Sequence, residues 1–250
     1  MVSVFRYHEI SESSHRIMNP LSVDKLMLLG DICRVRKSTR LLDLACGKGE
    51  MLCLFASKLD ASGVGIDVHR PFLADARARA AELGVERAVT FVEGDASDPP
   101  ELGERFDIVS CIGATWIGGG LSGTLELMGR LVVPGGWLLV GEVYWAEPPP
   151  PVLRQKHETG QGFADLAGTL DRFEVAGTEL VEMVLASLDD WDRFEASQWL
   201  NVSDWLAANP RDPELAEILE VRNISRHDYL AYGRRCIGWG VFVLRAQGRN

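Results

Sequence analysis

Hydrophobic residues along this chain follow two spacings that alternate with one another. Short apolar runs indicate buried strands, and we expect strands at 40–45, 63–68, 88–92, 106–112, 137–144, 179–187 and 239–246. Between them, apolar residues recur at the spacing of one helix face at 22–36, 50–59, 71–83, 121–131 and 163–173. Strands and helices that alternate at short intervals predict an α/β fold, with a mostly parallel, seven-stranded sheet covered by helices on both faces.

Three segments depart from this alternation. Residues 1–19 are polar with a few aromatics, which predicts a flap rather than a core element. The four prolines at 148–151 predict a loop, because proline cannot join a helix or a central strand. Residues 188–237 are helical and lie between the sixth and seventh expected strands, so we interpret them as a lid-like insertion. We therefore expect a single domain over residues 1–250.

Composition narrows the range of partners. The chain carries a formal net charge of −10, which argues against broad electrostatic binding to nucleic acid or to an anionic membrane. No apolar run is long enough to span a bilayer, and the first residues lack the pattern of a secretory signal. The five cysteines form no metal-binding spacing and indicate reduced thiols. We expect a cytoplasmic protein with no metal, nucleic-acid or membrane partner; its oligomeric state stays open.

The most informative segment is Asp43-Leu-Ala-Cys-Gly-Lys-Gly-Glu, which follows the first expected strand. Gly47 and Gly49 allow the backbone to pass close to a ligand at the carboxyl end of the sheet. Asp67 ends the second strand, where a carboxylate can accept both hydroxyls of a ribose. Either feature alone is most simply a tight turn or a helix cap, but together they favour a nucleoside site.

The loop also limits which nucleoside derivative fits. A dinucleotide motif needs a third glycine at position 52, which is leucine here, and the phosphate loop GxxxxGK[ST] is absent. Asp43 would repel a pyrophosphate, whereas it suits an amino group or a sulfonium. These residues therefore indicate an adenosine that carries positive charge.

Several motifs in order resemble those of the class I S-adenosylmethionine-dependent methyltransferases. They span residues 38–145 and comprise Leu41-Leu-Asp-Leu-Ala-Cys-Gly-Lys-Gly, Gly65-Ile-Asp, Glu93-Gly-Asp-Ala, Phe106-Asp-Ile-Val-Ser-Cys and Leu131-Val-Val-Pro-Gly-Gly-Trp-Leu-Leu. Ala45 departs from the usual first glycine. More narrowly, segments at 10–20, 113–117, 141–145 and 238–242 resemble a bacterial subgroup of small-molecule methyltransferases whose substrates are unknown.

The resemblance implies a Rossmann-like fold, S-adenosylmethionine as cofactor and a set of binding residues. Asp43 and the backbone from Ala45 to Gly49 would hold the methionine part, Asp67 the ribose, and Asp95 the adenine amino group. The expected cofactor residues are Asp43, Ala45, Cys46, Gly47, Gly49, Asp67, Val68, His69, Phe72, Gly94, Asp95, Ala96, Cys111 and Arg16. For Asp95, a loop cap is the alternative, and for Arg16 a surface position.

Methyl transfer from a sulfonium is an in-line displacement, so the enzyme mainly aligns the reactants and excludes water. A general base is needed only when the nucleophile arrives protonated. By position, Glu142 is the best candidate base, with a buried structural carboxylate as the alternative, and His15 is a second candidate. The expected substrate residues are Asn19, Trp116, Tyr144 and Trp145.

We therefore expect an S-adenosylmethionine-dependent methyltransferase that acts on a small molecule. The main alternative keeps the fold but catalyses a cyclisation or an elimination on a natural-product intermediate. A non-catalytic cofactor-binding module and methylation of RNA or protein are weaker alternatives. The substrate and its nucleophilic atom are not encoded in any motif of the chain.

Overall fold

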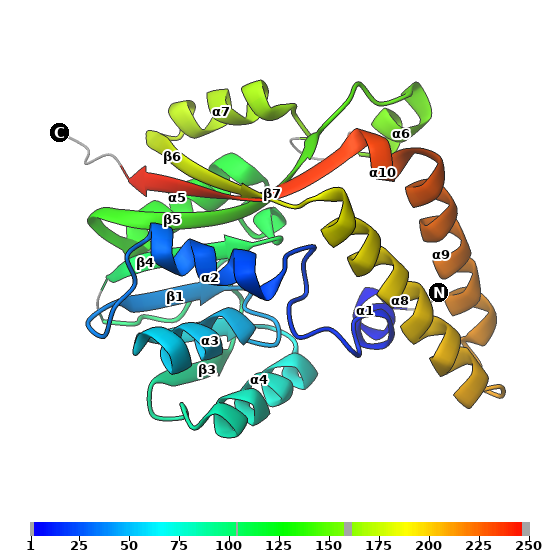
Figure 1. The fold of residues 1–250 in the computed structure, drawn as a ribbon, viewed down its shortest axis with the longest axis horizontal. Coiled ribbons are helices and arrows are strands. Elements are labelled where there is room, and N and C mark those ends of the chain that lie inside the picture. The colour runs from blue at the N-terminus through cyan, green and yellow to red at the C-terminus, as the bar shows by residue number, and fades with distance from the viewer. Residues whose placement is uncertain (1–2, 104, 158–161, 247–250) are drawn as a thin grey trace.

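A computed structural model describes residues 3–103, 105–157 and 162–246, which fold around a seven-stranded sheet in the order β3-β2-β1-β4-β5-β7-β6 (Figure 1). The strands are β1 (Arg40–Leu44), β2 (Ser62–Asp67), β3 (Val89–Glu93), β4 (Phe106–Ile112), β5 (Val132–Trp145), β6 (Thr178–Leu185) and β7 (Ile237–Ala246). Strands β1 to β5 pair in parallel, whereas β7 runs antiparallel to both β5 and β6. The expected mostly parallel sheet is confirmed.

Helices cover both faces of this sheet, because successive strand residues point to opposite sides. On one face lie α2 (Val23–Ile32), α3 (Glu50–Leu59) and α4 (Arg70–Leu83), where Leu29 and Phe55 pack in one core with Leu41. On the other face lie α5 (Leu121–Leu131) and α7 (Leu166–Val175), where Phe173 packs in a second core with Leu42.

Capping signals in the sequence account for the ends of several helices. The Ser22 side chain accepts a hydrogen bond from the Lys25 amide at the start of α2. Pro71 lies in the first turn of α4, and Gly84 ends that helix in the left-handed conformation. Asp165 caps α7, so this helix begins at Leu166 rather than at the expected residue 163.

Two irregular segments contain helices that the sequence analysis did not predict. Residues 1–19 include α1 (Val4–Ser11), which Ser3 caps and which buries Ile10 and Ser11. The proline run is a loop only in part, since Pro151 begins α6 (Pro151–Lys156). A proline in the first turn of a helix loses no helical hydrogen bond, because the amides there have no partner within the helix.

The segment between β6 and β7 is helical, as expected. It comprises α8 (Leu188–Ala208), α9 (Leu215–Asp228), the π-helical turn η2 (Tyr229–Gly233) and α10 (Arg234–Cys236). Figure 1 shows α8 and α9 side by side at one end of the sheet, with α1 between α8 and the sheet. Ile10, Val202 and Ile218 form a small core that joins α1 to both insertion helices.

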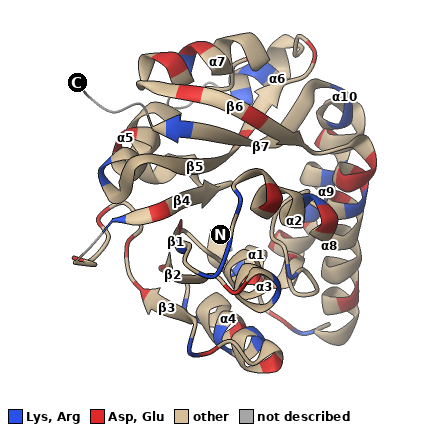
Figure 2. Ribbon diagram, turned by 60° about the vertical axis from the view of Figure 1, so that its left-hand side comes forward, with Lys and Arg blue, Asp and Glu red and all other residues tan. Residues whose placement is uncertain are grey.

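Acidic and basic segments are interspersed along α4, α8 and α9 (Figure 2). Such mixing leaves no continuous basic stripe on these helices. Within the described ranges, none of the helices is both long and apolar enough to cross a membrane.

Two glycines of α5 provide a matched test of the packing beside the 3-10 turn η1 (Thr115–Gly118). A Cβ atom at Gly123 would lie 2.0 Å from the Gly118 carbonyl oxygen, whereas a Cβ at Gly129 would meet no atom within 4 Å. We expect Gly123→Ala to lower the free energy of unfolding by about 1–3 kcal/mol through overpacking. Gly129→Ala should raise it by about 0.5–1 kcal/mol through helix propensity. Urea denaturation of both variants measures these changes, and equal effects would contradict the close contact.

Candidate active site

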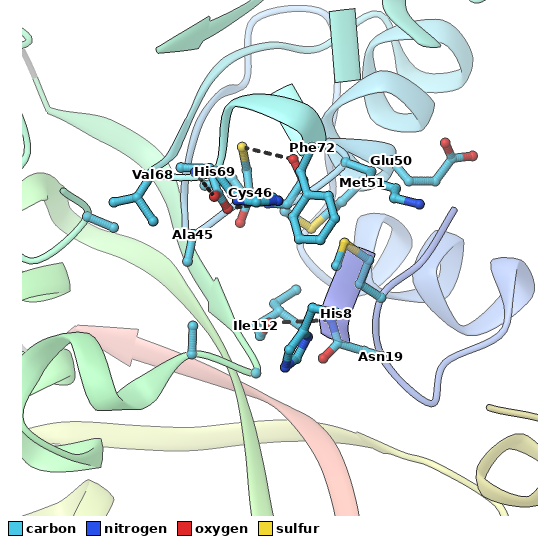
Figure 3. A pocket seen from close by; sticks show the side chains of 18 of the residues that line it. His8, Asn19, Ala45, Cys46, Glu50, Met51, Val68, His69, Phe72 and Ile112 are labelled. Atoms are coloured by element: carbon cyan, nitrogen blue, oxygen red, sulfur yellow. Dashed lines mark hydrogen bonds between the residues drawn. The ribbon is translucent and has the colours of Figure 1, made fainter. Parts of the chain in front are cut away.

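A cavity of ≈ 670 Å³ opens at the carboxyl ends of β1, β2 and β4. Its walls come from the glycine loop after β1, the ends of β2 and β3, the turn η1, and the segment that contains α1 (Figure 3). In a parallel α/β sheet this edge is the usual place for a ligand.

The glycine loop turns sharply as it leaves β1. Ala45, Gly47 and Gly49 all adopt left-handed backbone angles, with φ of 56°, 52° and 66°. A Cβ at Gly47 would lie 2.9 Å from the Met18 sulfur, so glycine here lets the N-terminal segment approach the loop. A Cβ at Gly49 would lie 2.4 Å from the Phe91 ring, so Gly49 is needed for packing in the core rather than for ligand approach.

Asp43 lies beneath this loop and is buried. It accepts a hydrogen bond from the Ser110 hydroxyl at 2.7 Å. Burial raises the pKa of Asp43 to about 7, and the nearby Asp67 also raises it, while the Ser110 hydrogen bond acts in the opposite direction. The Asp43 carboxylate is therefore poised to gain from a cation in the cavity.

Asp67 joins the glycine loop to the start of α4. One carboxylate oxygen accepts the Gly47 amide and the other accepts the His69 amide, each at 2.8 Å. These bonds hold the carboxylate at the cavity wall, and each oxygen keeps a lone pair for a further donor.

An apolar slot lies beyond Asp67. His69 stacks on Phe5 of α1 at 5.0 Å between ring centroids and meets Phe72 edge-on at 4.3 Å. Ala96 also lines the cavity, as does Asp95, which accepts the Ser97 amide and hydroxyl. These two hydrogen bonds hold the pKa of Asp95 below its usual value.

Most of the expected cofactor residues line one cavity. Those that do are Arg16, Asp43, Ala45, Cys46, Gly47, Asp67, Val68, His69, Phe72, Asp95 and Ala96. Gly49, Gly94 and Cys111 are not among the lining residues, and Cys111 is fully buried in the core around α5 and α7.

The expected substrate and catalytic residues divide in two. Asn19 and Trp116 line the cavity, whereas His15, Glu142, Tyr144 and Trp145 do not. The position of two of these residues along β5 explains why they do not line the cavity. Tyr144 packs with Val140 and Phe242 in the core on the α5 and α7 face of the sheet. Because side chains alternate along a strand, Glu142 lies on that face too.

Other contacts explain the remaining positions. A hydrogen bond from Thr115 reaches Glu142, and burial raises the pKa of this carboxyl group. Trp145 packs instead against Phe163 and His157.

Sequence reasoning missed one wall of the cavity. Val4, Phe5 and His8 of α1 line it, together with Ile17, Met18, Lys48 and Met51. Residues 4–8 reach the cavity through tertiary contacts, and no motif marks them. A capping serine at Ser3 was the available signal for a helix there.

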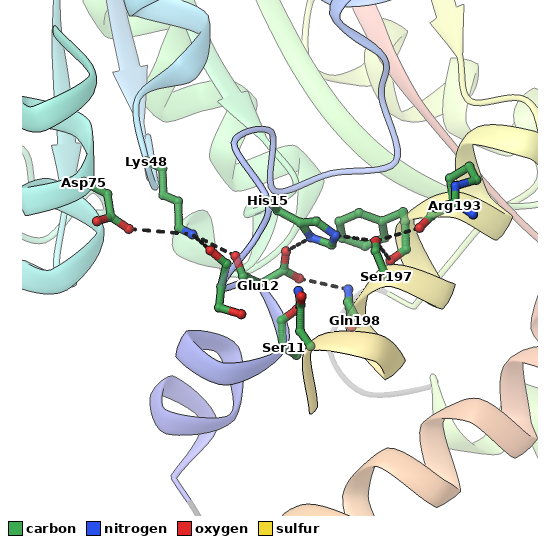
Figure 4. Close-up of polar contacts among 11 residues, drawn as sticks. Ser11, Glu12, His15, Lys48, Asp75, Arg193, Ser197 and Gln198 are labelled. Atoms are coloured by element: carbon green, nitrogen blue, oxygen red, sulfur yellow. Dashed lines mark hydrogen bonds and ion pairs between the residues drawn. The ribbon is translucent and has the colours of Figure 1, made fainter. Parts of the chain in front are cut away.

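Lys48 connects the glycine loop to the N-terminal segment that forms this wall. Its ammonium donates to the Glu12 carbonyl at 2.7 Å and to the Ser13 carbonyl at 3.4 Å, and it lies 3.6 Å from Asp75 (Figure 4). Burial lowers the pKa of Lys48, while Asp75 and Glu12 raise it. A buried ammonium with these partners holds the N-terminal segment against the cavity.

The same segment is also attached to α8. The Glu12 carboxylate bonds His15 and accepts from the Gln198 amide at 2.9 Å. The other His15 ring nitrogen lies 2.5 Å from the Ser197 hydroxyl, and the ring stacks on Phe194 (Figure 4). His15, a candidate base in the sequence, therefore faces the insertion and shares a polar network with it.

Replacing Lys48 tests its role as an attachment point. We expect Lys48→Met to raise amide hydrogen exchange in α1 by roughly 10- to 100-fold, because buried carbonyls left without a donor cost about 1–3 kcal/mol. Lys58→Met, on the exposed side of α3, is the control and should leave this exchange unchanged. Unchanged protection of α1 in Lys48→Met would contradict this role of Lys48.

Comparison with known proteins agrees with this geometry. A methyltransferase-domain family model matches residues 41–136. A SAM-dependent methyltransferase from Geobacter sulfurreducens, solved in complex with S-adenosyl-L-homocysteine, is 42% identical with a TM-score of 0.91, over 99% of this chain and 100% of that one. A SAM-dependent methyltransferase from Thiobacillus denitrificans, also solved with S-adenosyl-L-homocysteine, is 39% identical with a TM-score of 0.90, over 98% and 100% of the two chains.

A third relative is the uncharacterized protein YjhP of Escherichia coli, 43% identical over 97% of this chain and 98% of its own length. The matches cover nearly the whole chain, including α1 and the insertion between β6 and β7. The family expected from the sequence motifs is confirmed: this chain belongs to the S-adenosylmethionine-dependent methyltransferases.

Proposed function

We propose that this methyltransferase takes its methyl group from S-adenosylmethionine bound along the glycine loop and delivers it to a small molecule in the same cavity. The observation that carries this proposal is the placement of Asp67. Its carboxylate is held by two backbone amides at the cavity wall, between a cationic-ligand site at Asp43 and the apolar slot at Phe72. A ribose with an adenine on one side and an ammonium on the other matches that order.

The residues of the cavity fit the cofactor in chemistry as well as in order. Asp67 would accept the ribose hydroxyls, and Asp43 would face the ammonium across the glycine loop. The adenine would lie in the slot formed by His69, Phe72 and Ala96, with Asp95 at its amino group. When bound, the cofactor supplies a methyl group on a sulfonium, which needs no further activation.

The chain itself then has to align the acceptor and exclude water. Asn19 contributes to this because it is held at the end of β4, where its side-chain amide donates to the Ile112 carbonyl at 3.4 Å. A Cβ at Gly113 would lie 2.3 Å from the Asn19 oxygen, so glycine is required for this contact. Asn19 and Gly113 together form a polar position on the cavity wall away from Asp67.

Several features support a small acceptor rather than a macromolecule. Helix α1 and residues 16–19 line the cavity, so the chain itself covers part of its opening. The net charge of −10 also disfavours a polyanion such as RNA. All five cysteines are free thiols, which fits action in the cytoplasm.

Transfer of labelled methyl groups tests the function. Incubation with methyl-labelled S-adenosylmethionine and a size-fractionated cell extract should place label in the small-molecule fraction, with an equal amount of S-adenosylhomocysteine. Asp67→Asn should lose this transfer and bind S-adenosylhomocysteine roughly 10- to 100-fold more weakly, because a hydrogen bond to a charged group contributes about 1.5–3 kcal/mol.

Glu93→Gln is the matched control, since Glu93 lies opposite Asp67 in the β2–β3 register but is paired with Arg70 outside the cavity. It should retain both binding and transfer. Label in RNA or protein would contradict the small-molecule acceptor, and unchanged affinity in Asp67→Asn would contradict the cofactor site.

The pKa of Asp43 gives a second prediction, on pH. The Asp43 carboxyl group of the free protein has a pKa of about 7, and a bound ammonium favours its ionised form, so binding releases a proton below that pH. Affinity for S-adenosylhomocysteine should therefore be full above about pH 7 and fall by up to about tenfold per pH unit below it. Isothermal titration at several pH values measures this slope. Asp43→Asn should flatten it, and a slope that persists in this variant would assign it to another group.

A further inference from the structure

Within the part of the chain that the structure describes, His8 is the titratable side chain of the cavity without a partner. It lies on α1, is exposed, and in Figure 3 its imidazole points into the cavity from the side opposite Cys46 and Phe72. Among the residues that the structure describes, the His8 ring makes no hydrogen bond, ion pair or ring contact. Both ring nitrogens are therefore available to a ligand.

The carboxylates that line the cavity are all engaged. Asp43 accepts a hydrogen bond from the Ser110 hydroxyl, and Glu50 forms a bidentate ion pair with Arg79. The remaining carboxylates, with their partners, are Asp67 with the Gly47 and His69 amides, and Asp95 with the Ser97 amide and hydroxyl. In the proposed function Asp43, Asp67 and Asp95 are taken up by the cofactor, and Arg79 holds Glu50, so none of them is left to take a proton from an acceptor.

The basic side chains of the cavity are engaged too. Lys48 is bonded to two backbone carbonyls, and His69 lies 3.0 Å from the Glu9 carboxylate. Arg16 pairs with Glu82 at 3.3 Å. Among the described residues of this wall, His8 is thus the one whose ring nitrogens are free to exchange a proton with a bound acceptor.

The rim of the cavity near His8 is apolar. Val4 and Trp116 line the cavity outside the slot proposed for the adenine, although these residues are 70% and 72% exposed. Exposed apolar groups around an opening indicate a ligand with an apolar surface. Val4 and His8 lie four positions apart on α1, so part of this rim and the free imidazole share one helix face.

We propose that His8 is the general base of the methyl transfer, and that the acceptor is a largely apolar aromatic compound with an ionisable hydroxyl group. This inference rests on the proposed function and names its acceptor class. A phenolic hydroxyl keeps its proton at neutral pH, so it needs a base to accept that proton, and the imidazolium formed beside it favours the phenolate. An ammonium acceptor would instead need a free carboxylate on this wall.

The step balances with one proton transfer. As the acceptor oxygen forms its bond to the methyl carbon, the carbon–sulfur bond breaks with its electron pair on sulfur. The hydroxyl proton moves to a ring nitrogen of His8, which becomes an imidazolium and later returns the proton to solvent through the exposed side of α1.

The insertion gives His8 its position. Arg6, on the same helix, pairs with Asp212 at 2.6 Å and with Glu214 at 2.5 Å, at the turn between α8 and α9. The Asn201 amide of α8 donates to the Ser11 carbonyl at 2.7 Å. The insertion thus holds the helix that carries the base, rather than supplying a base of its own.

The ionisation of 4-nitrophenol tests the proposal without knowledge of the natural acceptor. With the protein bound to S-adenosylhomocysteine, at a pH below the ionisation range of the free probe, we expect the visible absorbance of bound 4-nitrophenolate. His8→Gln should abolish that absorbance and leave the affinity for S-adenosylhomocysteine unchanged. With labelled S-adenosylmethionine, methylation of the probe should fall by roughly 10²- to 10⁴-fold in this variant.

His227→Gln is the control, because His227 is exposed on α9 and does not line the cavity. Equal ionisation of the probe in wild type and His8→Gln, or no binding of the probe to the wild-type complex, would overturn the proposal. Failure of the wild type to bind S-adenosylhomocysteine would instead refute the proposed function.

Discussion

The buried ammonium of Lys48 joins the two halves of the cavity. It projects from the glycine loop and bonds carbonyls of the N-terminal segment, so residues more than thirty positions apart share one charged group. Burial of a charge is unfavourable, and here two carbonyls and the Asp75 carboxylate offset that cost. Without this contact, the wall that contains Phe5 and His8 would depend on the contacts of α1 with the insertion and with His69.

The two walls of the cavity differ in how far their residues can be predicted from the sequence. The wall that we propose for the cofactor comes from loops directly after β1, β2 and β3, where the position of a residue relative to its strand sets its place in space. Asp43, Asp67 and Asp95 were expected there from the sequence, and all three line the cavity. The wall that we propose for the acceptor comes from α1, whose place is set by contacts with Lys48 and the insertion that no local pattern encodes.

The residues after β5 show where strand position alone is insufficient. Glu142 and Tyr144 follow the same edge of the sheet as Asp43, but their parity along β5 turns them towards α5 and α7. His15 was a reasonable candidate by its closeness to Asn19, yet its ring is turned to Ser197 and Phe194. In both cases residue type and neighbourhood were predictable, and side-chain direction was not.

Local motifs form the wall proposed for the cofactor, whereas distant segments form the wall proposed for the acceptor. The two walls can therefore change independently, which matters for acceptor specificity. Changes in α1 or α8 can alter the acceptor wall while the Asp67 hydrogen bonds to Gly47 and His69 stay intact. Similar glycine loops can therefore serve different acceptors, because the loop anchors the N-terminal wall only through the Glu12 and Ser13 carbonyls and leaves the side chains of α1 free to differ. Since α1 is held by ion pairs and hydrogen bonds to the insertion, we expect the choice of acceptor to depend on the packing of residues 4–15 against α8.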